Sequence, residues 1–230
     1  MPGKQRLFRL FGIDVNLHYS FFILPVIFWF IYSRQGGAET GLRAVALVGL
    51  VFFCVIGHEF SHSLVARAFS IETSRITLYP IGGIASMGRI PEKPHQEFLI
   101  TLAGPLFNFV LAAILFFPLL NWLGPENFYS PSLSSWPKTI ANLFWINPML
   151  GLFNLIPAFP MDGGRILRAI LANWFSYRTA TQISARLGQL FAIIFFFYGI
   201  WTKNAMLVFI AFFVFTSASE EISRRGLNPL

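Results

Sequence analysis

Six long apolar stretches dominate this chain and limit the folds open to it, because each must be buried in lipid or in protein. A helix needs about 20 mostly apolar residues to cross a bilayer. The expected spans are Leu17–Tyr32, Ala44–Phe69, Phe98–Leu123, Thr139–Phe159, Ile183–Trp201 and Ala205–Ala218. Several prolines interrupt the fourth stretch, and the sixth is short. The pattern predicts an all-α polytopic membrane protein with about six transmembrane helices.

Composition supports a membrane environment. Hydrophobic residues make up 55% of the chain and charged residues 12%, whereas about a quarter of an ordinary soluble domain is charged. No polar stretch is long enough for a separate soluble domain, so we expect one membrane-embedded domain over residues 1–230. The basic N-terminus resembles the start of a secretory signal, but no small-residue cleavage site follows, which favours a retained first span. The single cysteine, Cys54, excludes an intrachain disulfide.

The distribution of basic residues predicts both the partner surface and the orientation. The net charge is +7, but its residues are scattered between apolar runs, which favours anionic lipid headgroups over nucleic acid. Lys and Arg near span ends are retained in the cytoplasm. With the N-terminus inside, 13 of the 17 basic residues fall on the cytoplasmic side, and the other four are Arg34, Arg43, Lys138 and Lys203. We therefore expect both termini in the cytoplasm, and the cell membrane as the location.

The segment Ile71–Pro94, between the second and third spans, has the composition of a β-hairpin. A β-branched pair, Ile76-Thr77, precedes Gly82 and Gly83, which can take positive φ angles in a turn. Its apolar character predicts a re-entrant hairpin at membrane depth, where protein or a water-filled cavity must satisfy irregular backbone. An ordinary cytoplasmic hairpin is the alternative.

The second span carries an H-E-x-x-H motif, His58-Glu59-Phe60-Ser61-His62. Its i, i+4 spacing places two imidazoles on one helix face, where they can share one Zn²⁺, with Glu59 beside them as general base. The alternative is a pair of helix-terminal histidines and a glutamate that reaches toward the membrane surface. That alternative leaves an ionisable residue inside an apolar helix unexplained, and such residues are usually functional.

A third zinc ligand is expected at similar depth, because catalytic zinc usually has three protein ligands and an open position. Asp162 is one of two aspartates in the chain and follows the proline-broken fourth span. Pro157 and Pro160 prevent a regular helix there, and Gly163-Gly164 permits a sharp turn, so the carboxylate can be aimed sideways. A helix cap is the other role open to this aspartate.

The motif H-E-x-x-H, followed by N-x-x-P-x-x-P-x-D-G-G from Asn154 to Gly164, resembles the site-2 protease family of intramembrane zinc metalloproteases. The resemblance covers nearly the whole chain, since Gly82-Gly83, the segment Gly104–Asn108 and Asn147-Pro148 also have counterparts. It implies zinc on His58, His62 and Asp162, and an asparagine, Asn154, that binds substrate or stabilises the oxyanion. Many relatives carry a PDZ domain or a CBS pair, and we expect this chain to be a minimal form without either.

The expected function is hydrolysis of peptide bonds in or near the transmembrane segments of membrane-protein substrates, with one zinc ion per chain. Candidate substrate-binding residues are Gly82, Gly83 and Asn108, and Asn108 has an interhelical structural role as its alternative. Cys54 lies on the same helical face as His58 and is a weaker ligand candidate. His18 is either near the site or simply interfacial. A zinc transporter or non-catalytic zinc-binding scaffold is the competing function, and neither would require Glu59 as a base.

Overall fold

The computed structural model describes residues 3–80, 82–87 and 93–226. The chain divides into two compact units, one of Met1–Ile90 and Leu106–Gly151 and the other of Pro91–Pro105 and Leu152–Leu230. Two helices run from one unit into the other, α2 (Pro94–Leu123) and α4 (Trp136–Asn154). Both units are mostly helical, as the long apolar runs predict, but the chain is not all-α, because the first unit also contains a β-sheet.

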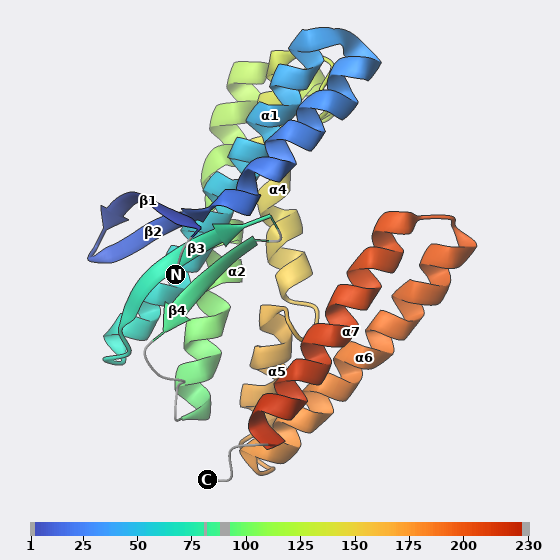
Figure 1. The fold of residues 1–230 in the computed structure, drawn as a ribbon. Helices are drawn as coiled ribbons and strands as arrows, with labels where there is room; N and C mark the ends of the chain where they lie inside the picture. The colour runs from blue at the N-terminus through green and yellow to red at the C-terminus, as the bar shows by residue number, and fades with distance from the viewer. Residues whose placement is uncertain (1–2, 81, 88–92, 227–230) are drawn as a thin grey trace. The chain divides into compact units, whose positions relative to one another are not determined.

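The first unit contains a four-stranded sheet of order β1-β2-β3-β4 (Figure 1). Its strands are β1 (Lys4–Leu10), β2 (Ile13–His18), β3 (Thr73–Tyr79) and β4 (Gly82–Met87). The β1–β2 and β3–β4 pairs are antiparallel, and β2 pairs with β3 in parallel. β3 and β4 form the hairpin expected in this region, and Gly82 has a φ of +133° at its turn.

The N-terminal strands differ from the sequence-based expectation. The first span was expected to begin at Leu17, but Leu17 lies in β2, and helix begins only with η1 (Tyr19–Phe22) and α1 (Ile23–Ala68). The sequence signal for β2 is the strict alternation of apolar and polar residues in IDVNLH, and its apolar residues Ile13, Val15 and Leu17 are the buried ones. The long apolar run that follows overlaps the last residues of the strand and hides this alternation.

Helix α1 consists of two arms, because Gly36 and Gly37 have non-helical backbone angles. Gly37 has a φ of +80°, which a glycine adopts at little cost. The two arms overlap in residues with the first two expected spans, and together with η1 they form one candidate membrane span, Tyr19–Ala68. The second arm packs against one face of the sheet in a core made of Ile13, Val15, Leu17, Val48, Phe52, Phe60, Ile76 and Leu78.

The rest of the first unit is formed by α2, the short α3 (Pro125–Phe128) and α4. Buried Leu119, Leu123, Phe128 and Ala141 form their shared core. Helix α4 ends at Asn154, before the expected Phe159. Pro157 and Pro160 lie in the missing stretch, and proline cannot supply the backbone N–H that a continuing helix needs.

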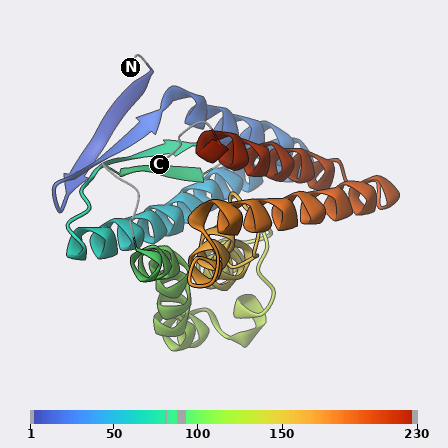
Figure 2. The ribbon, with the colours of Figure 1, turned by 90° about the horizontal axis from the view of Figure 1, so that it is seen from below.

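The second unit contains α5 (Asp162–Leu171), α6 (Tyr177–Trp201) and α7 (Ala205–Gly226). Helices α6 and α7 lie side by side along much of their length (Figures 1 and 2). Small residues permit this close approach, since a Cβ added at Gly199 of α6 would lie 2.9 Å from the Val208 side chain of α7.

The structure indicates an integral membrane protein. Within the described residues, four helical stretches are long and apolar enough to cross a bilayer: Tyr19–Ala68, Pro94–Leu123, Tyr177–Trp201 and Ala205–Ser223. The first of them includes both arms of α1. Large apolar side chains on these helices are exposed, such as Trp201 at 80% and Phe117 at 67%, and lipid is the solvent that suits them.

Candidate metal centre

The two histidines of the H-E-x-x-H motif lie together on the second arm of α1. Their side chains are buried, and the two Nε2 atoms are 3.1 Å apart. The i, i+4 spacing therefore places both imidazoles on one helix face, as expected. Burial of two imidazole rings with facing nitrogens is typical of metal ligands.

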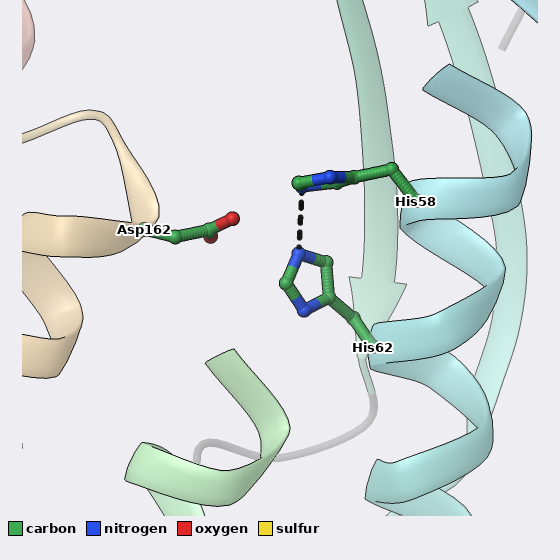
Figure 3. A group of neighbouring side chains, drawn as sticks. All are labelled: His58, His62 and Asp162. Carbon is green, nitrogen blue, oxygen red and sulfur yellow. Dashed lines mark hydrogen bonds between the residues drawn. The ribbon is translucent and has the colours of Figure 1, made fainter. Parts of the chain in front are cut away.

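Asp162 completes a group of three potential metal ligands. One ligand atom from each of His58, His62 and Asp162 lies within 4.8 Å of the others, and all three residues are buried (Figure 3). Zinc bonds of about 2.0–2.2 Å in tetrahedral geometry place neighbouring ligand atoms roughly 3.3 Å apart. The 3.1 Å between the two imidazole nitrogens is close to that spacing. Two neutral nitrogens and one carboxylate are also a donor set that catalytic zinc sites use, so the residues fit Zn²⁺.

The turn before α5 determines where Asp162 is presented. Asp162 is the first residue of α5, and Gly163 and Gly164 follow it. A Cβ added at Gly163 would lie 2.2 Å from the carbonyl oxygen of Ile156, and one added at Gly164 would lie 2.6 Å from the backbone nitrogen of Phe159. The first turn of α5 can therefore pack on the preceding loop only because both residues are glycines.

Glu59 lies on α1 beside the edge of the sheet. Its side chain is half-buried, and a Cβ added at Gly83 of β4 would be 2.7 Å from the Cγ of Glu59. β4 is the last strand in the sheet order. The structure thus brings together the expected base and one of the two hairpin glycines.

Asn108 makes interhelical hydrogen bonds, the alternative role given to it above, and one of them is to His58, a partner that the sequence does not indicate. It is fully buried in α2, and its Oδ1 lies 2.6 Å from the Nδ1 of His58. Its Nδ2 donates to the Oδ1 of Asn147 in α4 at 2.8 Å. The resemblance marked both asparagines as family elements, but no local signal in the sequence pairs either with a histidine.

The other candidate residues lie in different surroundings. Asn154 is half-buried at the last position of α4. Cys54 is buried and accepts a hydrogen bond from Asn147, and it is not part of the group of three ligands. His18 accepts the backbone N–H of Ser20 at the start of η1 and stacks on Tyr79 with ring centroids 4.9 Å apart.

Comparison with known proteins connects this geometry to a family. A model of the family described as peptidase family M50 matches residues 45–199, which include all three ligand candidates. The site-2 protease from Methanocaldococcus jannaschii has a solved structure that superposes with a TM-score of 0.70. It is 36% identical to this chain, and the match covers 95% of each chain.

Curated relatives bear similar names. A zinc metalloprotease of Methanocaldococcus jannaschii is 36% identical over 221 residues, which is 96% of this chain and 61% of the relative. A putative zinc metalloprotease of Mycobacterium tuberculosis is 28% identical over 244 residues, covering 96% of this chain and 59% of the relative. The chain thus spans about three fifths of the length of these relatives.

Proposed function

Because this chain belongs to peptidase family M50, we propose that it is an intramembrane zinc metalloprotease that hydrolyses peptide bonds in or near transmembrane segments of other membrane proteins. The observation that carries this proposal is the buried group of His58, His62 and Asp162 in a chain with helices long enough to cross a bilayer. A soluble substrate would have less need of a site built on such helices.

In this proposal, His58, His62 and Asp162 hold one zinc ion. When bound, zinc supplies a Lewis acid that polarises the scissile carbonyl and lowers the pKa of a water molecule. The three ligands come from two separate segments of the chain, α1 and the start of α5. Replacement of any one ligand should weaken metal binding, because the ion then loses one of its three protein ligands.

Glu59 is assigned the role of general base and then general acid. Its carboxylate takes a proton from the attacking water and delivers it to the amine that leaves when the peptide bond breaks. Asn154 is assigned the stabilisation of negative charge on the carbonyl oxygen, since a side-chain amide N–H can donate to it. This role is supported by the position of Asn154 as the first residue of the N-x-x-P-x-x-P-x-D-G-G motif, which also contains Asp162.

Strand β4 is the proposed binding place for substrate backbone. A transmembrane substrate hides its carbonyls in helical hydrogen bonds, so it must unwind before it is attacked. An unwound segment can pair with the edge of a sheet as an added strand, and β4 is the last strand in the order. Gly82 and Gly83 lie on this strand, and Gly83 contacts Glu59, which would bring bound backbone close to the base.

The proposed topology has six spans in one membrane domain: the two arms of α1, then α2, α4, α6 and α7. The break at Gly36 and Gly37 supports two spans within α1. The bias of basic residues supports cytoplasmic termini and a location in the cell membrane. The apolar β3–β4 hairpin is proposed to be re-entrant, lying at membrane depth within the protein.

Replacement of Glu59 by glutamine tests the proposal. Zinc content, thermal stability and cleavage of a reconstituted single-span substrate are compared for wild type, Glu59→Gln and Asp162→Ala. Wild type should hold about one zinc per chain. Glu59→Gln should keep zinc and fold but lose about 10²- to 10⁴-fold in cleavage rate, because glutamine cannot accept the proton. Asp162→Ala should lose zinc and activity together.

The outcomes separate the competing functions. Unchanged cleavage by Glu59→Gln would contradict the metalloprotease mechanism. A wild type that binds zinc but cleaves nothing, and is indifferent to Glu59→Gln, would favour the transporter or scaffold. Stoichiometric zinc in Asp162→Ala would remove Asp162 from the ligands.

A further inference from the structure

A chain of buried hydrogen bonds connects His58 of α1 to the backbone of α4 through two asparagines. The Nδ1 of His58 is 2.6 Å from the Oδ1 of Asn108, and the Nδ2 of Asn108 is 2.8 Å from the Oδ1 of Asn147. The Nδ2 of Asn147 is in turn 2.8 Å from the carbonyl oxygen of Leu143 and 3.2 Å from the Sγ of Cys54. We call these bonds the asparagine relay. Both asparagines have an exposed fraction of 0%.

The direction of the asparagine relay follows from its last partner. A backbone carbonyl can only accept a hydrogen bond, so Asn147 must turn its NH₂ group toward Leu143. The Oδ1 of Asn147 then faces Asn108, which must donate with its own NH₂ group. The Oδ1 of Asn108 is left to face His58, and an amide oxygen accepts only. Nδ1 of His58 must therefore carry the proton and donate it.

One protonated ring nitrogen in a neutral imidazole leaves the other with a free electron pair. The second nitrogen of His58, Nε2, is the atom that faces the Nε2 of His62. We propose that Asn108 is a positioning residue that, through Asn147 and the Leu143 carbonyl, holds His58 in the tautomer that presents Nε2 to the metal. This inference rests on the proposed function, in which His58 is a zinc ligand.

The choice of asparagine rather than aspartate suits the surroundings. Metal-binding histidines usually donate their other N–H to a carboxylate, a carbonyl or water. A carboxylate at Asn108 would add an ionised group to a fully buried position on a candidate membrane span, and buried charge is costly there. An amide supplies the same acceptor without the charge. It requires a second partner to hold its orientation, because either end of an amide can face the histidine, and Asn147 supplies that partner.

A purely structural role is the competing explanation, because the same hydrogen bonds also join α1, α2 and α4. The two roles differ in what each substitution should do. Asn108→Leu removes both the acceptor for His58 and the donor for Asn147. Asn108→Asp keeps an acceptor for His58 but sets a second oxygen against the Oδ1 of Asn147. If the bonds are only structural, zinc affinity should fall whenever thermal stability falls. If the asparagine relay positions His58, zinc affinity should depend on whether the side chain at position 108 offers His58 an acceptor.

The experiment measures zinc affinity by competition with a chelator, the visible absorption of bound Co²⁺, and the melting temperature in detergent for the full chain and its variants. Asn108→Leu should bind zinc about 10- to 100-fold more weakly than wild type, the usual cost of losing the partner of a metal-binding histidine. Its Co²⁺ spectrum should also change, because the ring is no longer held in one orientation. Asn108→Asp should regain most of the zinc affinity while its melting temperature stays low.

Asn142→Leu is the matched control. Asn142 lies on α4 like Asn147, and its Nδ2 likewise donates to the carbonyl four residues earlier, that of Lys138, but it makes no hydrogen bond to the members of the asparagine relay. It should leave zinc affinity and the Co²⁺ spectrum unchanged. Wild-type zinc affinity in Asn108→Leu would overturn the relay alone. Equal loss of affinity in Asn108→Leu and Asn108→Asp would also overturn it, and a wild type that binds no zinc would overturn the proposed function together with this inference.

Discussion

The position of the Glu59 side chain depends on the absence of a side chain at Gly83. A Cβ at Gly83 would lie 2.7 Å from the Cγ of Glu59 and 3.3 Å from the Cγ1 of Val55. The first distance is shorter than van der Waals contact allows, and Cγ is not the free end of the glutamate. The carboxyl group would have to move to make room. This contact links the edge of the sheet directly to the proposed base.

Gly83→Ala is therefore expected to lower the cleavage rate by about 10- to 100-fold, since a shift of about 1 Å in a catalytic group can cost that much. Zinc content should remain at the wild-type level, because neither imidazole is touched. Rates with a single-span substrate and zinc content by mass spectrometry would measure both effects.

Gly49→Ala is the control for this substitution. An added Cβ at Gly49 of α1 meets no atom within 4 Å, and alanine favours a helix over glycine by about 1 kcal/mol. Its rate should match wild type. A Gly83→Ala rate equal to that of Gly49→Ala would show that the Glu59 carboxyl tolerates the added methyl group.

At the scale of elements, the helices of the second unit are joined by one buried arginine. Arg168 of α5 donates from Nε to Oε1 of Glu97 at 3.0 Å, and it pairs through Nη1 with Glu221 of α7 at 2.5 Å. Tyr177, at the start of α6, donates its hydroxyl to the other oxygen of Glu97. The exposed fractions of Arg168 and Glu97 are 3% and 2%. Burial opposes the charge on Arg168, but Glu97, Tyr177 and Glu221 outweigh it and raise the pKa of Arg168.

Arg168→Met should lower the stability of the chain by about 3–5 kcal/mol, because it leaves the carboxylate of Glu97 buried without its partner. The double variant with Glu97→Gln should recover part of the loss, since it removes the stranded charge. Thermal unfolding in detergent, monitored by circular dichroism, would give the melting temperatures of wild type, Arg168→Met and the double variant. Arg165→Met, an exposed site on the same helix, is the control, and an equal effect at both positions would contradict a stabilising role for the pair.

At the scale of the whole molecule, the proposed topology can be tested with single cysteines. The background is Cys54→Ser, because serine keeps an acceptor for the Asn147 side chain. Ser130→Cys lies between α2 and α4, on the side expected to face outward, and Ser223→Cys lies near the end of α7. Both positions are exposed. A membrane-impermeant thiol reagent added to intact cells should label Ser130→Cys alone.

Opened cells provide the control for this experiment, since both cysteines should then react. Labelling of Ser223→Cys in intact cells, with Ser130→Cys protected, would reverse the proposed orientation. Labelling of both in intact cells would contradict the proposed number of spans between them.

The sequence alone determined those features that depend on short-range spacing. A helix repeats every 3.6 residues, so H-E-x-x-H predicts two imidazoles on one face, and the structure confirms that they face each other. Long apolar runs predict membrane helices because no other backbone arrangement of a single segment satisfies its polar groups in lipid. The prolines and glycines around Asp162 predict a break and a turn for equally local reasons.

Only the tertiary structure decided which distant segments meet. The parallel pairing of β2 with β3, the contact of Gly83 with Glu59 and the bond from Asn108 to His58 join residues far apart in the chain. Their sequence neighbourhoods carry no mark of these partners, because hydrogen bonds and close packing depend on how whole helices and strands come together. The tautomer of His58 is the sharpest case, since it follows from a carbonyl oxygen 85 residues away, that of Leu143.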